Sequence, residues 1–200
     1  MRVFGAFTLR WQPAAHVTGP VQSCGAMGSP NEVSGAAHVG GRTLLRLEGV
    51  APSIAARVQA LRELLKHPAE ELGTLDSRAL WRDVRDARML PADGIVWRIS
   101  CAPTDGPAIV ARIRAQRPAD ALYDWSGGLI WLALPPSADA DHALVRGALS
   151  GGHATLIRAP EAVRAALPVF QPQSPALAAL SARVKESFDP KGLFNPGRMG

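Results

Sequence analysis

Hydrophobic and polar residues follow two different periods along this chain, and together these periods predict short strands alternating with helices. In GIVWRIS, Ile95, Trp97 and Ile99 share one face of an extended segment, as expected for a strand that buries that face. In PSIAARVQALRELLK, Ile54 and Val58 begin a stripe of hydrophobic residues spaced three or four apart. That spacing is typical of an amphipathic helix, so we expect helices packed on a sheet.

The predicted elements follow the chain almost without interruption, apart from residues 12–31, which show neither period and predict a loop or a damaged element. We expect strands at 1–11, 32–39, 43–49, 94–100, 121–125, 129–135 and 154–159, and helices near 53–66, 76–84, 106–117, 139–149, 160–166 and 175–188. Helices interleaved with hairpins indicate an α+β domain, an antiparallel sheet with helices on one face, of the ferredoxin-like type.

Composition and charge narrow the class of protein. The chain has 200 residues, 47% hydrophobic and 20% charged, which suits one large domain or two small ones without disulfides. The net charge of +5 comes from basic residues scattered among acidic ones, and this pattern does not predict nucleic-acid binding. Cys24 and Cys101 form no C-x-x-C pair, so neither a metal site nor a redox dithiol is predicted.

The same composition gives an expected location. No hydrophobic run reaches the ~18 residues that a membrane helix needs, so no transmembrane segment is predicted. Cysteine usage is typical of a reducing compartment. We therefore expect a cytoplasmic protein, or one associated with a membrane through partner subunits.

One face of the predicted sheet carries charged residues. Alternation in TLLRLEG places Arg46 and Glu48 away from Leu45 and Leu47, and the same alternation places Arg98 on that polar face. Two arginines on one face can bind an anionic substrate or lie over a cofactor, so Arg46 and Arg98 are the candidate substrate contacts. The alternative is a solvated or interface-facing sheet with surface ion pairs, which is common in antiparallel sheets.

For the other polar residues of interest, the sequence favours a structural role over a catalytic or metal-binding one. His153 begins a strand after two glycines, with no second histidine or carboxylate at ligand spacing, and His38 lies within a strand. Asp124 precedes the hairpin sequence Ser126-Gly127-Gly128 and is expected to cap its own turn, although a functional turn with Trp125 stays open.

The chain ends in SFDPKGLFNPGRMG, where a helix stops at Asp189-Pro190 and a turn-rich tail begins. DPKGLFNPGRM resembles the C-terminal signature of FAD-linked oxidases of the vanillyl-alcohol oxidase type. The segments GSPNEVSGAAHV, TLLRLEG, LWRDVRD, VWRIS, YDWSGGLIWL and GGHATLIRAP extend this likeness in order over about 27–200. Together they resemble the FAD-binding subunit (E subunit) of bacterial glycolate oxidases.

This resemblance implies an activity, a cofactor and partners. It implies oxidation of glycolate to glyoxylate with FAD as acceptor, in a complex with a catalytic FAD subunit and an iron-sulfur subunit. It also implies that Asn195 and Arg198 in the tail contact the flavin domain or the flavin. Two alternatives remain: an FAD-linked oxidase of another 2-hydroxy acid, and a non-catalytic scaffold that bridges the subunits.

The chain departs from this family in two places. The Gly-rich half that holds FAD in the family would precede this region, and residues 10–26 lack the helical stripe expected there. We therefore expect three segments: an irregular N-terminal segment (1–26), a cap-like α+β domain (27–174), and a helix with a tail that docks on a flavin domain (175–200). A truncated or frameshifted gene is the hypothesis that explains both departures, and such a chain is not expected to be active alone.

Overall fold

The computed structural model describes residues 4–11, 28, 31–65 and 68–194, and divides the chain into two compact units, 1–170 and 171–200. The predictions for residues 12–26 and for the last six residues of the tail lie outside the described residues. The elements of the first unit are β1 (Phe4–Trp11), β2 (Gly35–Val39), β3 (Arg42–Val50), α2 (Ala51–Leu65), β4 (Glu70–Leu72), α3 (Thr74–Arg85), β5 (Ile95–Ser100), α4 (Gly106–Arg114), β6 (Asp120–Asp124), the 3-10 turn η1 (Trp125–Gly127), β7 (Leu129–Leu134), α5 (His142–Gly147), β8 (His153–Arg158) and α6 (Glu161–Ala166). The second unit contains α7 (Pro175–Phe188).

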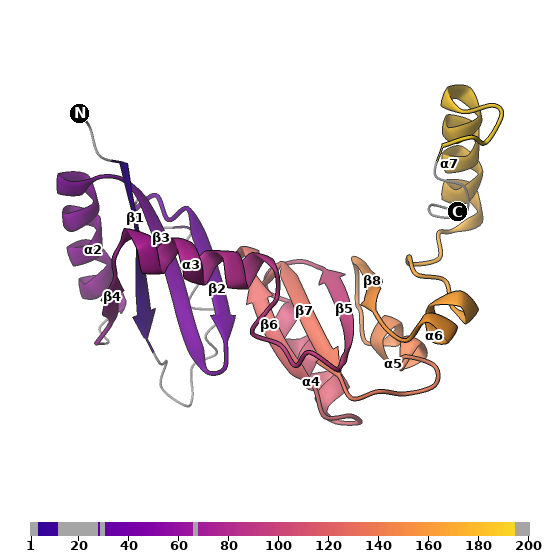
Figure 1. The fold of residues 1–200 in the computed structure, drawn as a ribbon, viewed down its shortest axis with the longest axis horizontal. Helices are drawn as coiled ribbons and strands as arrows, with labels where there is room; N and C mark the ends of the chain where they lie inside the picture. The colour runs from indigo at the N-terminus through magenta and orange to yellow at the C-terminus, as the bar shows by residue number, and fades with distance from the viewer. Residues whose placement is uncertain (1–3, 12–27, 29–30, 66–67, 195–200) are drawn as a thin grey trace. The chain divides into compact units, whose positions relative to one another are not determined.

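The first unit is built on a single sheet of eight strands in the order β4-β1-β3-β2-β6-β7-β5-β8 (Figure 1). Every pair of neighbouring strands is antiparallel. The predicted class, an α+β domain with an antiparallel sheet, is confirmed. None of the helices in the described part of the chain is long and apolar enough to span a membrane.

Most helices pack on one face of this sheet. At one end, Ile54, Val58 and Leu61 of α2 pack against β1, β2 and β3. At the other end, residues of α4, α5 and α6 surround the fully buried Trp97 and Ile99 of β5. The strand face that alternation predicts to be hydrophobic packs against the hydrophobic stripes of the helices, so the two sequence patterns agree with the packing.

Helix α3 corrects the expectation that all helices share one face. Val84 of α3 and Leu90 after it pack with Leu44, Val96 and Leu122, which point to the opposite face of the sheet. We call this the α3 face. The physical reason lies in adjacent hydrophobic pairs such as Leu44-Leu45, because consecutive strand residues point to opposite faces and both faces then need a cover.

The edge formed by β8 is occupied by the chain itself. The Leu156 backbone N–H donates to the Val169 carbonyl oxygen at 2.9 Å. The Arg146 guanidinium donates to the carbonyl oxygens of Pro168 and Phe170 at 2.5 and 2.9 Å, which fixes that segment beside the strand. The ring of Trp97 lies 5.4 Å from the same guanidinium.

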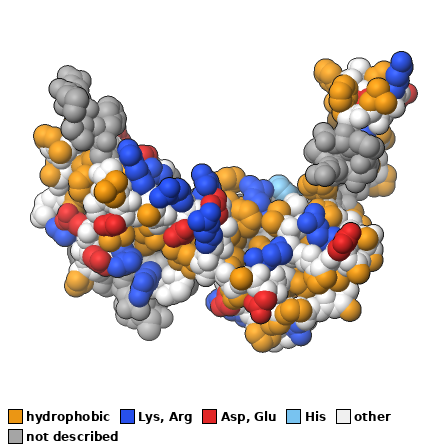
Figure 2. All heavy atoms as spheres, in the orientation of Figure 1, with side chains coloured by type: hydrophobic (Ala, Val, Ile, Leu, Met, Phe, Trp, Pro, Cys, Tyr) orange, Lys and Arg blue, Asp and Glu red, His pale blue; other side chains and the backbone are white. Residues whose placement is uncertain are grey.

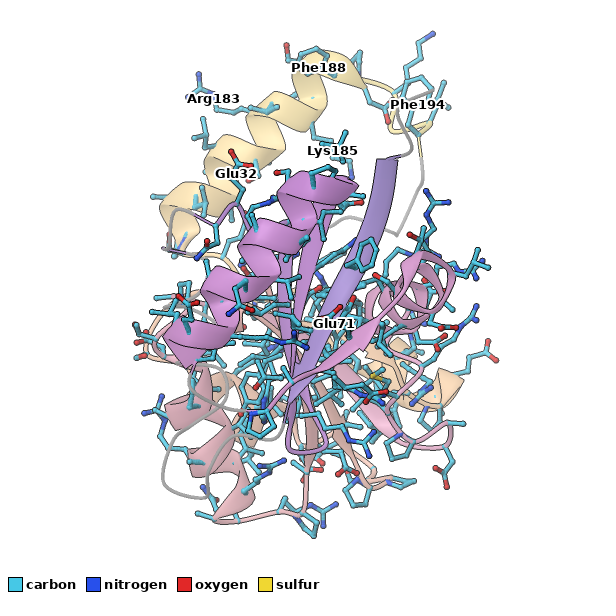
Figure 3. The ribbon with its side chains drawn as sticks, turned by 90° about the vertical axis from the view of Figure 1, so that its left-hand side faces the viewer. Glu32, Glu71, Arg183, Lys185, Phe188 and Phe194 are labelled. Atoms are coloured by element: carbon cyan, nitrogen blue, oxygen red, sulfur yellow. The ribbon has the colours of Figure 1, made fainter. Side chains whose placement is uncertain are left out.

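The second unit is a helix followed by a defined turn. α7 begins with Pro175 in its first turn and ends before Asp189, whose carboxylate accepts hydrogen bonds from the backbone N–H groups of Leu193 and Phe194. No residue of α7 is buried, and Phe188 is 83% exposed. Phe188 and Phe194 lie at the end of the helix and in the turn after it (Figure 3). The predicted stripe of Leu177, Leu180 and Val184 is present on this helix and uncovered within its own unit.

Candidate functional site

The α3 face is where the structure places the charged residues selected from the sequence. Figure 2 views this face and shows Arg side chains, in blue, gathered over α3 and the neighbouring strands. Arg46 and Arg98 both point to the α3 face, as predicted from alternation, because each shares a strand face with a residue of its buried cluster.

Arg46 is committed to contacts within the fold. Its guanidinium donates to Glu48 Oε1 at 2.7 Å and lies 5.9 Å from the centre of the Trp81 ring. Trp81 Nε1 donates to the Thr8 hydroxyl at 2.9 Å, and Thr8 shares a 2.8 Å hydrogen bond with the Ser77 hydroxyl. Arg46 therefore belongs to a polar network that ties β3, α3 and β1 together.

The absence of a side chain at Gly35 leaves room for the Trp81 ring on β2. A Cβ atom at Gly35 would lie 3.2 Å from two atoms of the Trp81 ring, which is tighter than ordinary packing. The ring thus rests on the bare backbone of β2, and any larger residue at this position would have to displace it.

Arg98 differs from Arg46 because no carboxylate among the described residues lies within ion-pair distance of it. Its guanidinium carbon lies 5.4 Å from the centre of the Trp125 ring. Trp125 is 57% exposed, so this pair faces solvent on the α3 face. A contact with an aromatic ring does not use up the N–H donors of a guanidinium, so they stay available for an oxyanion.

The two arginines do not form one site. β3 and β5 are separated by β2, β6 and β7, which makes four inter-strand spacings. At roughly 4.8 Å each, these spacings put Arg46 and Arg98 about 19 Å apart across the sheet. A small 2-hydroxy acid cannot touch both at this separation, so each arginine is considered separately as a substrate contact.

The turn that carries Trp125 has an unusual backbone. Trp125 and Ser126 have φ of 49° and 58°, in the left-handed region that non-glycine residues rarely adopt. Each such residue costs about 1–2 kcal/mol. Asp124 Oδ1 accepts the Trp125 backbone N–H at 2.8 Å, which confirms that this aspartate caps its own turn, and burial raises the pKa of its carboxyl.

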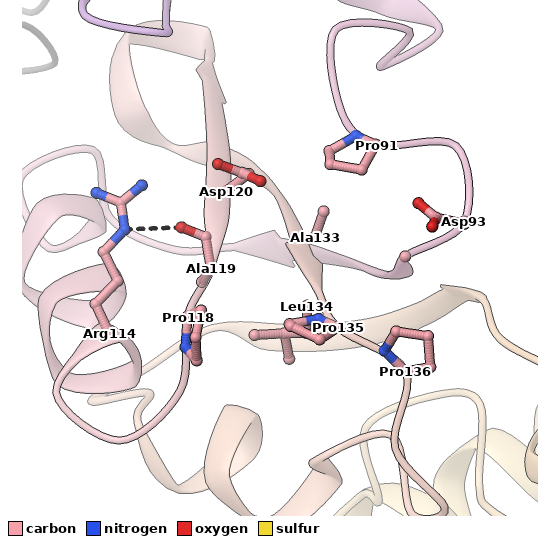
Figure 4. A pocket seen from close by; sticks show the side chains of 11 residues that line it. Pro91, Asp93, Arg114, Pro118, Ala119, Asp120, Ala133, Leu134, Pro135 and Pro136 are labelled. Atoms are coloured by element: carbon pink, nitrogen blue, oxygen red, sulfur yellow. Dashed lines mark hydrogen bonds between the residues drawn. The ribbon is translucent and has the colours of Figure 1, made fainter.

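A hollow of about 560 Å³ opens where β6 begins and β7 ends (Figure 4). Pro91, Pro118, Pro135 and Pro136 line much of it, with Asp93 and Asp120 at its mouth. Arg114, also on its wall, donates from Nε to the Ala119 carbonyl oxygen at 2.9 Å. Two carboxylates disfavour a diphosphate by like-charge repulsion, so this hollow does not fit FAD.

The remaining candidates are two histidines and a cysteine that lie apart from one another along the described chain. His153 is exposed, and the half-buried His38 shares a 2.9 Å hydrogen bond with the Thr43 hydroxyl while burial lowers its pKa. Burial raises the pKa of the Cys101 thiol, which works against a reactive thiolate. Among the described residues, no three His, Cys, Asp or Glu side chains gather as a metal site would require.

The structure also shows residues that the sequence reasoning did not select. The Thr8–Ser77–Trp81 network depends on the packing of α3 against β1. No local sequence pattern predicts this contact between two elements far apart in the chain. Asp189 was expected only to stop α7, whereas its carboxylate also accepts two backbone N–H groups of the turn. The Asp-x-x-Gly spacing after a helix is the signal that could have predicted this cap. Asn195 and Arg198 lie outside the described residues.

Comparison with known proteins agrees with the resemblance seen in the sequence. The chain matches no family model. It is 33% identical over 172 residues to glycolate oxidase subunit GlcE of Escherichia coli (strain K12), and the alignment covers 85% of this chain. It covers 42% of that protein, so the chain spans less than half the length of this relative. The resemblance to a glycolate oxidase subunit is confirmed, and the partial coverage is consistent with a match to the C-terminal part.

Proposed function

We propose that this chain is the C-terminal region of an FAD-linked subunit that takes part in oxidising glycolate to glyoxylate. The single observation that supports it most is the 33% identity to a glycolate oxidase subunit over 85% of this chain. The reaction removes two electrons and two protons from the substrate, and FAD, where it is bound, supplies the acceptor for them. In this proposal, residues outside the described part hold the cofactor.

The sheet contributes Arg98 as the substrate contact in this proposal. Glycolate is a small carboxylate, and the guanidinium of Arg98 has in-plane donors that no described carboxylate occupies. Arg46 is less suited, because Glu48 and Trp81 already hold its guanidinium. The bidentate carboxylate contact therefore falls to Arg98, and Arg46 has a structural part.

A paired substitution tests this division within the purified glycolate-oxidising complex that contains the chain. We expect Arg98→Ala to raise KM for glycolate at least tenfold, since a charge-assisted hydrogen bond contributes roughly 1.5–3 kcal/mol. Arg46→Ala is the matched control and should lower thermal stability with KM little changed. Unchanged KM and kcat in both variants, with the complex still assembled, would instead favour a non-catalytic scaffold.

The identity of the 2-hydroxy acid requires its own measurement. Glycolate, lactate and longer 2-hydroxy acids offered to the same complex should give the highest kcat/KM with glycolate. A preference for a larger acid would move the proposal to another FAD-linked oxidase of 2-hydroxy acids. The supporting subunits in this proposal are a catalytic FAD subunit and an iron-sulfur subunit, and co-purification of both is the check.

In the same proposal, the role of the second unit is to dock on another part of the enzyme. Leu177, Leu180, Val184 and Phe188 expose one apolar stripe on α7, and Asn195 and Arg198 come after the turn in the chain. We propose that this helix and tail dock on the flavin-binding part, with Asn195 and Arg198 closest to it. Flavin absorbance after incubation of the chain with FAD and gel filtration provides the test. A colourless protein agrees with a binding site elsewhere, whereas retained flavin would show that these 200 residues hold FAD themselves.

A further inference from the structure

The turn Asp124–Gly127 holds a largely exposed tryptophan on a strained backbone. Trp125 and Ser126 are consecutive non-glycine residues with positive φ, followed by Gly127 with φ of 101°. More than half of the Trp125 residue surface stays accessible to solvent. The strained backbone of this turn positions the indole ring over Arg98.

Contacts with neighbouring residues keep the backbone of the turn in this conformation. The Asp124 carboxylate accepts the Trp125 N–H at 2.8 Å, and the Gly128 N–H donates to the Trp125 carbonyl oxygen at 3.1 Å. The loop before α4 approaches so closely that a Cβ atom at Gly106 would lie 2.7 Å from the Gly127 carbonyl oxygen. The backbone of the turn is therefore held by three separate contacts.

We propose that this turn is a positioning device that holds Arg98 ready for the carboxylate of a small 2-hydroxy acid. The ring lies beside the guanidinium and restrains its long side chain, while no described carboxylate occupies the N–H donors of Arg98. Less rotamer freedom is then lost when the anion binds. This inference rests on the proposed function, in which Arg98 is the substrate contact, and adds Trp125 as a residue that acts through it.

Kinetics of glycolate oxidation by the assembled complex provide the experiment, with flavin content measured for each variant. We expect Trp125→Ala to raise KM about twofold to fivefold with kcat and flavin content unchanged, which is the factor that corresponds to the loss of an exposed cation–π contact. Trp125→Phe should stay within about twofold because it keeps an aromatic face. Leu64→Ala, which removes an exposed hydrophobic side chain from α2 on the opposite face of the sheet, is the control and should leave KM unchanged.

A double substitution separates positioning from a direct contact. If Trp125 acts through Arg98, the Arg98→Ala/Trp125→Ala variant has the KM of Arg98→Ala alone. Independent, multiplying effects on KM would overturn the proposal. If Trp125→Ala fails to assemble, Trp125→Leu keeps the bulk without the aromatic face and should match the KM expected for alanine; a wild-type KM in Trp125→Leu also overturns it.

The outcomes distinguish this inference from the proposed function. A raised KM in Arg98→Ala together with a normal KM in Trp125→Ala removes the positioning role and leaves Arg98 as the substrate contact. A normal KM in Arg98→Ala removes the substrate contact itself. Loss of flavin from both variants with KM unchanged would identify the bound oxyanion as the phosphate of the cofactor and overturn the assignment to a 2-hydroxy acid.

Discussion

The carboxylate of Asp189 accepts the backbone N–H of Phe194 at 2.9 Å, five residues further along the chain. A second hydrogen bond of 2.9 Å, from the Leu193 N–H to the other carboxylate oxygen, closes the same turn. One side chain thus both ends α7 and shapes the turn after this helix. Because the turn presents Leu193 and Phe194 to solvent, its shape decides which apolar groups are available for docking.

The Asp189 turn should open when its carboxylate is protonated. The hydrogen bonds from Phe194 and Leu193 hold the pKa of Asp189 below its ordinary value. A lowered folded-state pKa means that the turn is fully stabilised above the unfolded-state value of about 3.9 and loses this stability as pH falls through the folded-state value. The amide proton shifts of Leu193 and Phe194, followed by NMR from pH 7 to pH 2, should move together only in the acid range. Asp189→Ala should show the open-turn shifts at pH 7, and a wild-type spectrum for this variant would contradict the assignment.

A methyl group at Gly35 should destabilise the sheet. Gly35→Ala places a Cβ atom 3.2 Å from the Trp81 ring and pushes that ring off β2, which we expect to lower the free energy of unfolding by about 1–3 kcal/mol. Urea unfolding followed by tryptophan fluorescence measures it. Gly147→Ala is the matched control, because nothing lies within 4 Å of a Cβ there and alanine favours the end of α5 by up to about 1 kcal/mol. Equal midpoints for the two variants would mean that Trp81 does not depend on Gly35.

Ala87 should be more stable as glycine. It follows the C-terminal cap of α3 with φ of 51°, the position and conformation where glycine is usual. Ala87→Gly relieves the left-handed strain but adds freedom to the unfolded chain, so we expect a net gain of about 0.5–1 kcal/mol. Thermal unfolding by circular dichroism measures this gain. Ala79→Gly, at an exposed position inside α3, should have the opposite sign and lose about 1 kcal/mol. A lower melting temperature for Ala87→Gly would refute the strain argument.

The single tyrosine of the chain provides a spectroscopic test of the core. Burial raises the pKa of Tyr123 to about 12. Since this pKa is raised above the unfolded-state value of about 10, stability is unaffected below pH 10 and decreases as pH rises from there toward 12. Absorbance at the tyrosinate band should therefore rise with a midpoint near 12 in the folded protein and near 10 in denaturant. A midpoint near 10 without denaturant would mean that β6 does not bury this ring.

Local patterns in the sequence are sufficient to predict most of the helices and strands and the direction in which their side chains point. Alternation in GIVWRIS correctly predicts that Ile95, Trp97 and Ile99 share the buried face with the helices, because side-chain direction in a strand is a local property. The last helix has its predicted bounds, since Pro175 and the Asp189-Pro190 pair are strong start and stop signals. The three-residue β4 escapes prediction because so short a strand has no period of its own.

The candidate site needs information that no local pattern contains. Arg46 and Arg98 share a sheet face, as predicted, yet their separation depends on the order of strands in the sheet, which is set by contacts far apart in the sequence. The cover over Arg46 likewise depends on α3 crossing to the face that was expected to stay polar. The contact between Trp125 and Arg98 joins the turn η1 to β5, which are brought together by the pairing of both β5 and β6 with β7.

The segment 168–170 beside β8 has a consequence for how copies of this protein behave in solution. An open sheet presents unpaired backbone groups at its outer strands, and these groups attract other strands into edge-to-edge aggregates. Here Arg146 fastens a short piece of the chain against the exposed side of β8, where the Leu156 N–H is already used. By holding this segment in place, Arg146 hinders edge-to-edge association of two copies through β8.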